Sequence, residues 1–168
     1  DMITMGKPMG NGIPISGLAA KEDVLAAFSD KLPYFNTFGG NPVSIAAAQA
    51  VLKYIKDENL QEHCKKAGAA LLKALKEVQE RHPESVGDVR GAGLFLGFEF
   101  VKNDGNKTPD KDMALNVIEM LRDEHILTSV IGHYGNILKL RPPMVFSEND
   151  IDWFATSLDK CITKLENK

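Results

Sequence analysis

The sequence is poor in cysteine, and its histidines are few and scattered. Only two of the 168 residues are cysteines, Cys64 and Cys161, and no CxxC pair occurs. Two thiols so far apart argue against a disulfide framework and a zinc site, and they favour a reducing compartment. No two of the four histidines lie four residues apart. They are therefore interpreted as loop or solvated residues, and no metal site is predicted.

An excess of charge of one sign is also lacking, as is any long apolar run. The 20 Lys and Arg residues nearly balance the 23 Asp and Glu residues, which gives a net charge of −3. Without a basic patch, a nucleic-acid partner is not expected. No run approaches the roughly 20 apolar residues that a membrane-spanning helix needs, so no membrane role is expected. The apolar content of 43% predicts a globular chain with a buried core.

Glycine and proline punctuate the first forty residues. Between Met2 and Ala20 they exclude a helix and predict short buried strands joined by tight turns. A short helix is predicted over Lys21–Phe28. Asn41 is a suitable helix cap and Pro42 suits a first helical position, so a long helix should follow.

The rest of the chain alternates helices with short strands. A single apolar stripe predicts an amphipathic helix over Leu60–Arg81. Alternating residues on both sides of Gly91-Ala92-Gly93 predict an antiparallel strand pair. The remaining elements are predicted as a helix from Thr108-Pro109, strands over Ile126–Val130 and Ile137–Leu140, and a last helix from Ser147.

Lys7 is the first candidate for chemistry. It is the only charged residue between Asp1 and Lys21, in a stretch rich in glycine and apolar residues. Desolvation there would favour the neutral amine, which is a nucleophile. The flanking glycines leave room for a flat ligand near the backbone. The alternative is an ordinary loop lysine that reaches solvent.

Two further stretches offer anion-binding groups. The loop from Asn36 to Asn41 combines the Thr37 hydroxyl, two glycines and a predicted helix N-terminus, which would suit a phosphate group. Ordinary turn and cap hydrogen bonding is the alternative. Arg141 ends a predicted strand just before Pro142-Pro143, where a rigid turn could aim its guanidinium at a carboxylate. A surface arginine at a strand end is the alternative.

Four stretches carry a resemblance to a known family. They read TMGKPMGNGIPISG, YFNTFGGNPVSIAAAQAVL, VGDVRGAGLFLGFEF and LKLRPPMVFSENDID. In order and spacing they resemble the C-terminal part of the class III, pyridoxal-phosphate-dependent aminotransferases, the ornithine or omega group. These sequences are most similar to the branch of alanine-glyoxylate aminotransferase 2-like proteins, which includes phospho-lyases acting on phosphoethanolamine and phosphohydroxylysine.

The resemblance implies a role for each candidate residue. Lys7 would be the Schiff-base lysine of pyridoxal 5'-phosphate, and Thr37 would bind the cofactor phosphate of the neighbouring subunit in a homodimer. Arg141 would hold a substrate α-carboxylate. The phospho-lyases tend to carry lysine at that position, so Arg141 favours an amino-acid substrate and transamination to a keto acid. Elimination of phosphate is the alternative reaction.

The implied fold is the α/β plan of fold-type I transferases, present in part. Residues 1–50 would end the large cofactor-binding domain, and residues 51–168 would form the small α+β domain. The family's phosphate loop, its cofactor-stacking ring and the aspartate that pairs with the pyridine nitrogen all precede the lysine. The chain is therefore expected to be a fragment of a longer cytoplasmic or mitochondrial-matrix enzyme. A non-catalytic dimerisation or folding module is the alternative for the isolated chain.

Overall fold

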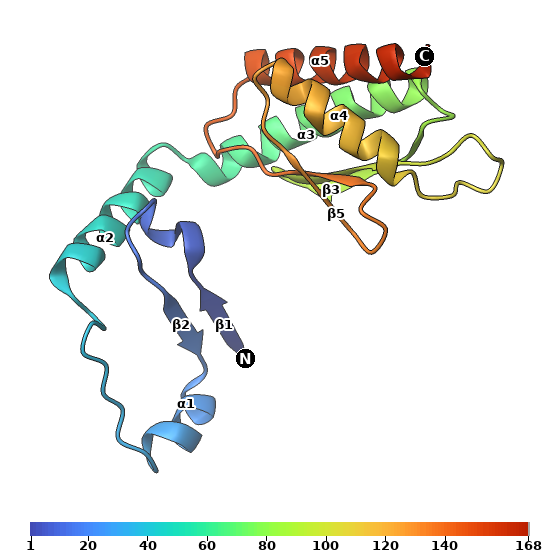
Figure 1. The fold of residues 1–168 in the computed structure, drawn as a ribbon. Helices are drawn as coiled ribbons and strands as arrows, with labels where there is room; N and C mark the ends of the chain where they lie inside the picture. Colours follow the sequence, from blue (N-terminus) through green and yellow to red (C-terminus); the bar gives the residue numbers. More distant parts are fainter. Residues whose placement is uncertain (168) are drawn as a thin grey trace. The chain divides into compact units, whose positions relative to one another are not determined.

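The computed structural model describes residues 1–167, and it divides into two compact units (Figure 1). The first unit spans Asp1–Asn59 and the second begins at Leu60. Among the described residues, no helix has the length and apolar character to cross a bilayer. The same residues contain no group of three or more His, Cys, Asp and Glu side chains arranged to hold a metal ion.

The first unit begins with two short paired strands. Strand β1 (Met2–Met5) runs antiparallel to β2 (Gly17–Ala20), and a 3-10 turn, η1 (Lys7–Gly10), lies between them in sequence. The predicted strands are confirmed, but their predicted burial is wrong. All four residues of β1 are exposed, because the two-stranded ribbon has no third layer to cover it within this unit.

Two helices complete the first unit. Helix α1 (Glu22–Ser29) occupies the stretch predicted as a short helix. Helix α2 (Pro42–Asp57) begins at the predicted proline, and the Asn41 side chain accepts a hydrogen bond from the Ser44 amide at 2.9 Å. That bond satisfies one of the amides that a helix start leaves without an intrahelical partner. No residue of α2 is buried.

The second unit is built on a four-stranded antiparallel sheet. In chain order its strands are β3 (Val86–Ala92), β4 (Phe95–Phe100), β5 (Ser129–Ile131) and β6 (Ile137–Leu140), and the spatial order is β3-β4-β6-β5. The predicted pairing around residues 91–93 is confirmed. The strand predicted over Ile126–Val130 begins later, at Ser129, because the Ile126 amide closes the end of the preceding helix on Leu121.

Three helices cover one face of this sheet (Figure 1). They are α3 (Leu60–Arg81), α4 (Lys111–Asp123) and α5 (Glu148–Glu166). The predicted start of α4 at Thr108-Pro109 is wrong: Pro109 forms a β-bridge with Val101, and the Asp110 side chain caps the helix instead. The buried side chains of strands and helices form one core, with Leu75, Phe98, Phe100, Leu138 and Leu158 among its members.

Alternation along the strands leaves the opposite face of the sheet uncovered within this unit. Val89, Phe98 and Leu138 are cross-strand neighbours and point into the core. The next residues, Arg90, Gly97 and Lys139, are also neighbours and therefore lie on the other side. We call this side the open face.

A backbone contact sets the distance between α3 and the β3–β4 turn. Gly68 in α3 is buried, and a Cβ added to it would lie 2.2 Å from the carbonyl oxygen of Gly93. Gly93 has a φ of +54°, a left-handed conformation that favours glycine. The helix and the turn therefore touch without an intervening side chain.

Candidate functional site

Lys7 lies at the first position of η1, directly after β1. Its backbone is in the left-handed region, with a φ of +50°. Such a conformation is uncommon for a residue with a side chain and is found preferentially at functional positions. The side chain is exposed, which agrees with the alternative of a loop lysine that reaches solvent and not with an apolar surrounding. Within residues 1–167 no carboxylate forms a salt bridge with its amine, so the amine is accessible to a ligand.

Thr37 lies in the exposed loop that leads into α2. The amides of Phe38 and Gly39 both donate to the Asn36 side-chain oxygen, at 3.2 and 3.1 Å. These amides are therefore occupied by turn bonding, and the free amide cradle expected here is not formed by them. The Thr37 hydroxyl has no hydrogen-bond partner among the described residues. The hydroxyl therefore remains available to a phosphate.

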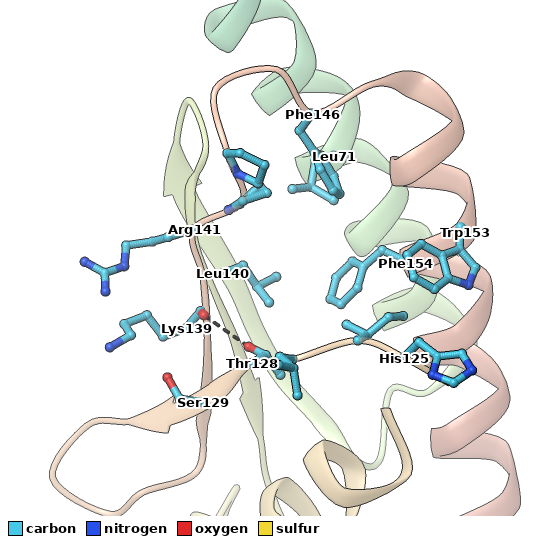
Figure 2. Close-up of a pocket in the computed structure, with 14 residues that line it drawn as sticks. Leu71, His125, Thr128, Ser129, Lys139, Leu140, Arg141, Phe146, Trp153 and Phe154 are labelled. Carbon is cyan, nitrogen blue, oxygen red and sulfur yellow. Dashed lines mark hydrogen bonds between the residues drawn. The ribbon is translucent and has the colours of Figure 1, made fainter. Parts of the chain in front are cut away.

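Arg141 follows β6 in the second unit, and a second cation lies on the same side of the strand. Lys139 precedes it by two residues, and Figure 2 shows both side chains pointing to the same side of β6, away from Leu140. No sequence motif marks Lys139, although strand alternation places it on the same face as Arg141. Neither cation forms a salt bridge within residues 1–167.

The neighbours of these cations on the open face are small, polar or aromatic. Gly97 on β4 pairs with Lys139 and supplies no side chain, while Ser129 on β5 pairs with it from the other side. The Arg141 guanidinium lies 5.9 Å from the ring centre of Phe95, a cation–π distance. Phe95 is 59% exposed, unlike Phe98 and Phe100 of the same strand, which are buried in the core.

Arg90 shares the open face but is already neutralised. Its guanidinium lies 2.6 Å from Asp88 and 2.7 Å from Glu99. The hydrogen bonds from Glu99 and Asp88 raise the pKa of Arg90, because they stabilise the charged form. Lys139 and Arg141 are therefore the cations of this face that remain free to bind an anion.

A cavity of about 510 Å³ lies beside β6 in the same unit. Its lining is mostly apolar and includes Leu140, Phe146, Trp153 and Phe154 (Figure 2). Arg141 is among the lining residues, yet its guanidinium points to the other side of β6 from Leu140. The strand's alternation directs this side chain to the open face and not into the cavity, and its predicted binding of a carboxylate stays a prediction.

The candidate residues thus form two groups. Lys7 and Thr37 belong to the unit that ends at Asn59, and Lys139 and Arg141 belong to the unit that begins at Leu60. The first group offers an exposed amine and a hydroxyl group. The second offers two adjacent positive charges.

Comparison with known proteins gives the family. The family model described as aminotransferase class-III matches residues 1–162. A Caenorhabditis elegans protein named ethanolamine-phosphate phospho-lyase homolog 1 is 45% identical over 164 residues, which are 97% of this chain and 35% of that protein. A Drosophila melanogaster protein named alanine–glyoxylate aminotransferase 2-like is 39% identical over 165 residues, which are 97% of this chain and 33% of that protein.

The same family is found among solved structures. A phospholyase from Arthrobacter in complex with phosphoethanolamine superposes with a TM-score of 0.92 at 38% identity, over 96% of this chain and 38% of that one. The chain spans about a third of the length of the curated relatives it matches. The neighbours confirm the implied fold class, that of fold-type I transferases. The chain therefore belongs to the class III aminotransferases, a family of enzymes that depend on pyridoxal phosphate.

Proposed function

We propose that this chain forms the C-terminal part of a homodimeric class III enzyme that acts on small primary amines. Lys7 would hold pyridoxal phosphate through its side-chain amine, and Thr37 would donate its hydroxyl to the cofactor phosphate of the partner subunit. The exposed amine without a salt bridge and the hydroxyl without a partner, both within residues 1–167, fit these roles. Bound pyridoxal phosphate supplies an electron sink for the substrate carbon that bears the amine.

Lys7 would also remove the proton from the substrate carbon that bears the amine. Its Nζ, once displaced from the cofactor by the substrate amine, would act as a general base and remove the proton. A lysine suits this task because its amine is compact and sits on a flexible stem. The left-handed backbone at Lys7 supports the proposal, since the chain accepts an unfavourable conformation at this residue.

The pair formed by Lys139 and Arg141 supports a phosphorylated substrate. A single arginine is sufficient for a carboxylate, which it binds through two parallel hydrogen bonds. A phosphate monoester carries up to two negative charges and three acceptor oxygens, which match two neighbouring cations. We therefore favour elimination of phosphate over transamination.

In this reaction the bond between the neighbouring carbon and the phosphate oxygen breaks. Inorganic phosphate leaves with the bonding electrons, and the remaining enamine tautomerises to an imine, which one water hydrolyses to an aldehyde and ammonia. Lys139 and Arg141 would hold the phosphate before and after the break. No keto acid is consumed. Transamination is the second candidate, and Arg141 favours it because an arginine suits the α-carboxylate of an amino acid.

The assay that separates the two reactions uses the full-length enzyme loaded with pyridoxal phosphate. We expect steady-state release of inorganic phosphate from phosphoethanolamine without added keto acid. Replacing Lys139 with Ala should raise KM for phosphoethanolamine about tenfold or more, as expected for one charged hydrogen bond. Lys73→Ala, on the exposed side of α3, is the matched control and should leave KM unchanged. Amino-group transfer that requires a keto acid, with no phosphate released, would refute the elimination reaction.

The role of Lys7 is tested by chemical labelling. Borohydride reduction in the presence of pyridoxal phosphate should modify Lys7 of the full-length enzyme stoichiometrically. The isolated 168-residue chain should show scattered labelling or none. Specific labelling of another lysine in the full-length enzyme would overturn the assignment, and the absence of any specific labelling would support the non-catalytic module.

A further inference from the structure

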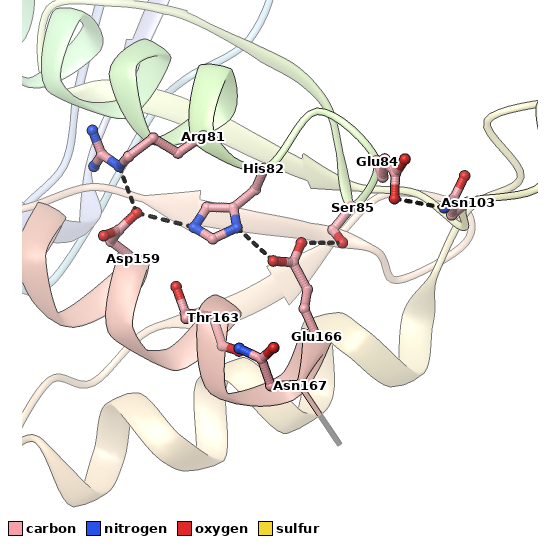
Figure 3. Close-up of polar contacts among 9 residues, drawn as sticks. All are labelled: Arg81, His82, Glu84, Ser85, Asn103, Asp159, Thr163, Glu166 and Asn167. Atoms are coloured by element: carbon pink, nitrogen blue, oxygen red, sulfur yellow. Dashed lines mark hydrogen bonds and ion pairs between the residues drawn. The ribbon is translucent and has the colours of Figure 1, made fainter.

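His82 is a buried histidine that links the end of α3 to α5. Its side chain is 6% exposed. Its Nδ1 lies 2.7 Å from a carboxylate oxygen of Glu166, and its Nε2 lies 3.0 Å from a carboxylate oxygen of Asp159 (Figure 3). The two acids are seven residues apart on α5, which is two helical turns, and therefore face the same way. One imidazole ring thus bridges two carboxylates.

The donor and acceptor roles of the three side chains determine which ring nitrogens must carry a proton for both contacts to be hydrogen bonds. A carboxylate can only accept hydrogen bonds, and a neutral imidazole has a single N–H to donate. Both contacts are hydrogen bonds only when both ring nitrogens carry a proton. We propose that His82 is a pH-sensitive clasp, which as an imidazolium bonds both carboxylates and secures the C-terminal half of α5, and which releases one of them when it becomes neutral.

The surrounding charges agree with a protonated ring. Arg81 Nε donates to Asp159 at 2.8 Å, and the Ser85 hydroxyl donates to Glu166 at 2.6 Å. One arginine and two carboxylates sum to −1, and a charged His82 brings the group to zero; of the four side chains only that of His82 is buried. The nearby Glu84 is engaged elsewhere, with the Asn103 amide at 2.7 Å (Figure 3).

Asp159 remains an acceptor throughout. Its burial acts to raise the pKa of the carboxyl group, but the hydrogen bonds from Arg81 and His82 outweigh this effect and lower the pKa. The carboxylate is therefore ionised at any pH at which imidazole titrates. A change of pH in that range acts on the clasp through the ring of His82.

The backbone holds His82 in place, so loss of the clasp frees α5 and not the histidine. The His82 amide donates to the Val78 carbonyl at 3.1 Å. The His82 carbonyl accepts the amides of Ser85 and Val86, at 3.2 and 3.0 Å, at the start of β3. The histidine is thereby fixed to the corner between α3 and β3. Only the α5 side of the clasp can move away.

The test measures amide hydrogen exchange in α5 of the 168-residue chain as a function of pH, corrected for the intrinsic exchange rate. The clasp acts while the His82 ring is protonated and is lost as rising pH removes that proton. We expect protection of the amides from residue 159 to 166 to fall about tenfold between the protonated and the neutral ring, as for the loss of one charged hydrogen bond. Protection of α4 should not change.

Two variants and one direct measurement complete the test. In His82→Gln the protection of α5 should be lower at pH 6 and independent of pH, because glutamine does not titrate. His133→Gln, which replaces an exposed histidine with no acidic partner in the described residues, should behave as wild type. Nitrogen NMR of the wild-type ring should show both nitrogens protonated at pH 6. A neutral ring at pH 6, or unchanged pH dependence in His82→Gln, would overturn the proposal.

Discussion

Replacing Gly68 with alanine sets two opposing effects against each other. Alanine is the better helix former, by about 1 kcal/mol over glycine in a helix interior. Its Cβ, however, would lie 2.2 Å from the Gly93 oxygen, 2.3 Å from the carbonyl carbon and 2.6 Å from Cα, all of them backbone atoms. Backbone cannot rotate away as a side chain can, so α3 and the β3–β4 turn must separate.

The steric cost should exceed the gain in helix propensity, so the substitution should lower the free energy of unfolding. Overpacking a core costs typically 1–3 kcal/mol, and the upper end applies here because only backbone can move, at roughly 3 kcal/mol. The expected net loss in the free energy of unfolding is therefore about 2 kcal/mol. Ala69→Gly, at an exposed position on the same helix, is the control. It should lose about 1 kcal/mol from helix propensity alone.

Equilibrium urea unfolding provides the measurement. Trp153 is the only tryptophan of the chain and lies on α5, so its fluorescence reports on the unit that contains Gly68. Gly68→Ala should unfold at a lower urea concentration than both wild type and Ala69→Gly. An unfolding midpoint equal to or above that of wild type would refute the role of the backbone contact.

Two further predictions concern caps and buried polar groups. Ser147→Ala removes the N-cap of α5 and should cost about 1 kcal/mol by urea unfolding. Hydrogen bonds from the Ser147 hydroxyl and amide lower the pKa of Asp150. The stabilisation that these bonds give the folded chain is therefore present above the ordinary carboxyl pKa and is lost as pH falls. In Ser147→Ala, NMR titration should show the Asp150 pKa nearer its ordinary value. Asn136 is buried and donates to the Phe100 carbonyl at 2.7 Å, so Asn136→Ala should cost roughly 1–3 kcal/mol by the same urea assay. A variant as stable as wild type would contradict either assignment.

Local signals in the sequence predicted most of the elements. The helix over Leu60–Arg81 was predicted to the residue, because its apolar stripe is continuous and both ends are marked. Asn41 and Ser147 were recognised as helix starts from the residue type alone, and both side chains accept a capping hydrogen bond. The start of α4 was missed because a long-range bridge from Val101 holds Pro109 in extended backbone. Sequence distance hides such a contact.

The candidate site was predictable in its residues but not in its surroundings. Lys7, Thr37 and Arg141 were identified from the sequence and the family it resembles, and their roles stay predictions. The sequence left open whether Lys7 is buried or reaches solvent, since burial depends on what other elements cover a segment. The neutralisation of Arg90 depends on the register between β3 and β4, which brings Glu99 beside it. The clasp at His82 joins residues 77 and 84 positions apart in the chain.

Glu99 determines how much positive charge the open face presents to a ligand. Its carboxylate engages Arg90 from the neighbouring strand, and Asp88 alone would remain if Glu99 were neutral. Under the proposed function, the charge available for binding an anion can therefore be adjusted at Glu99, on β4, while the two cations at the end of β6 stay intact. A protein engineer who wishes to accept more highly charged substrates would begin with this carboxylate.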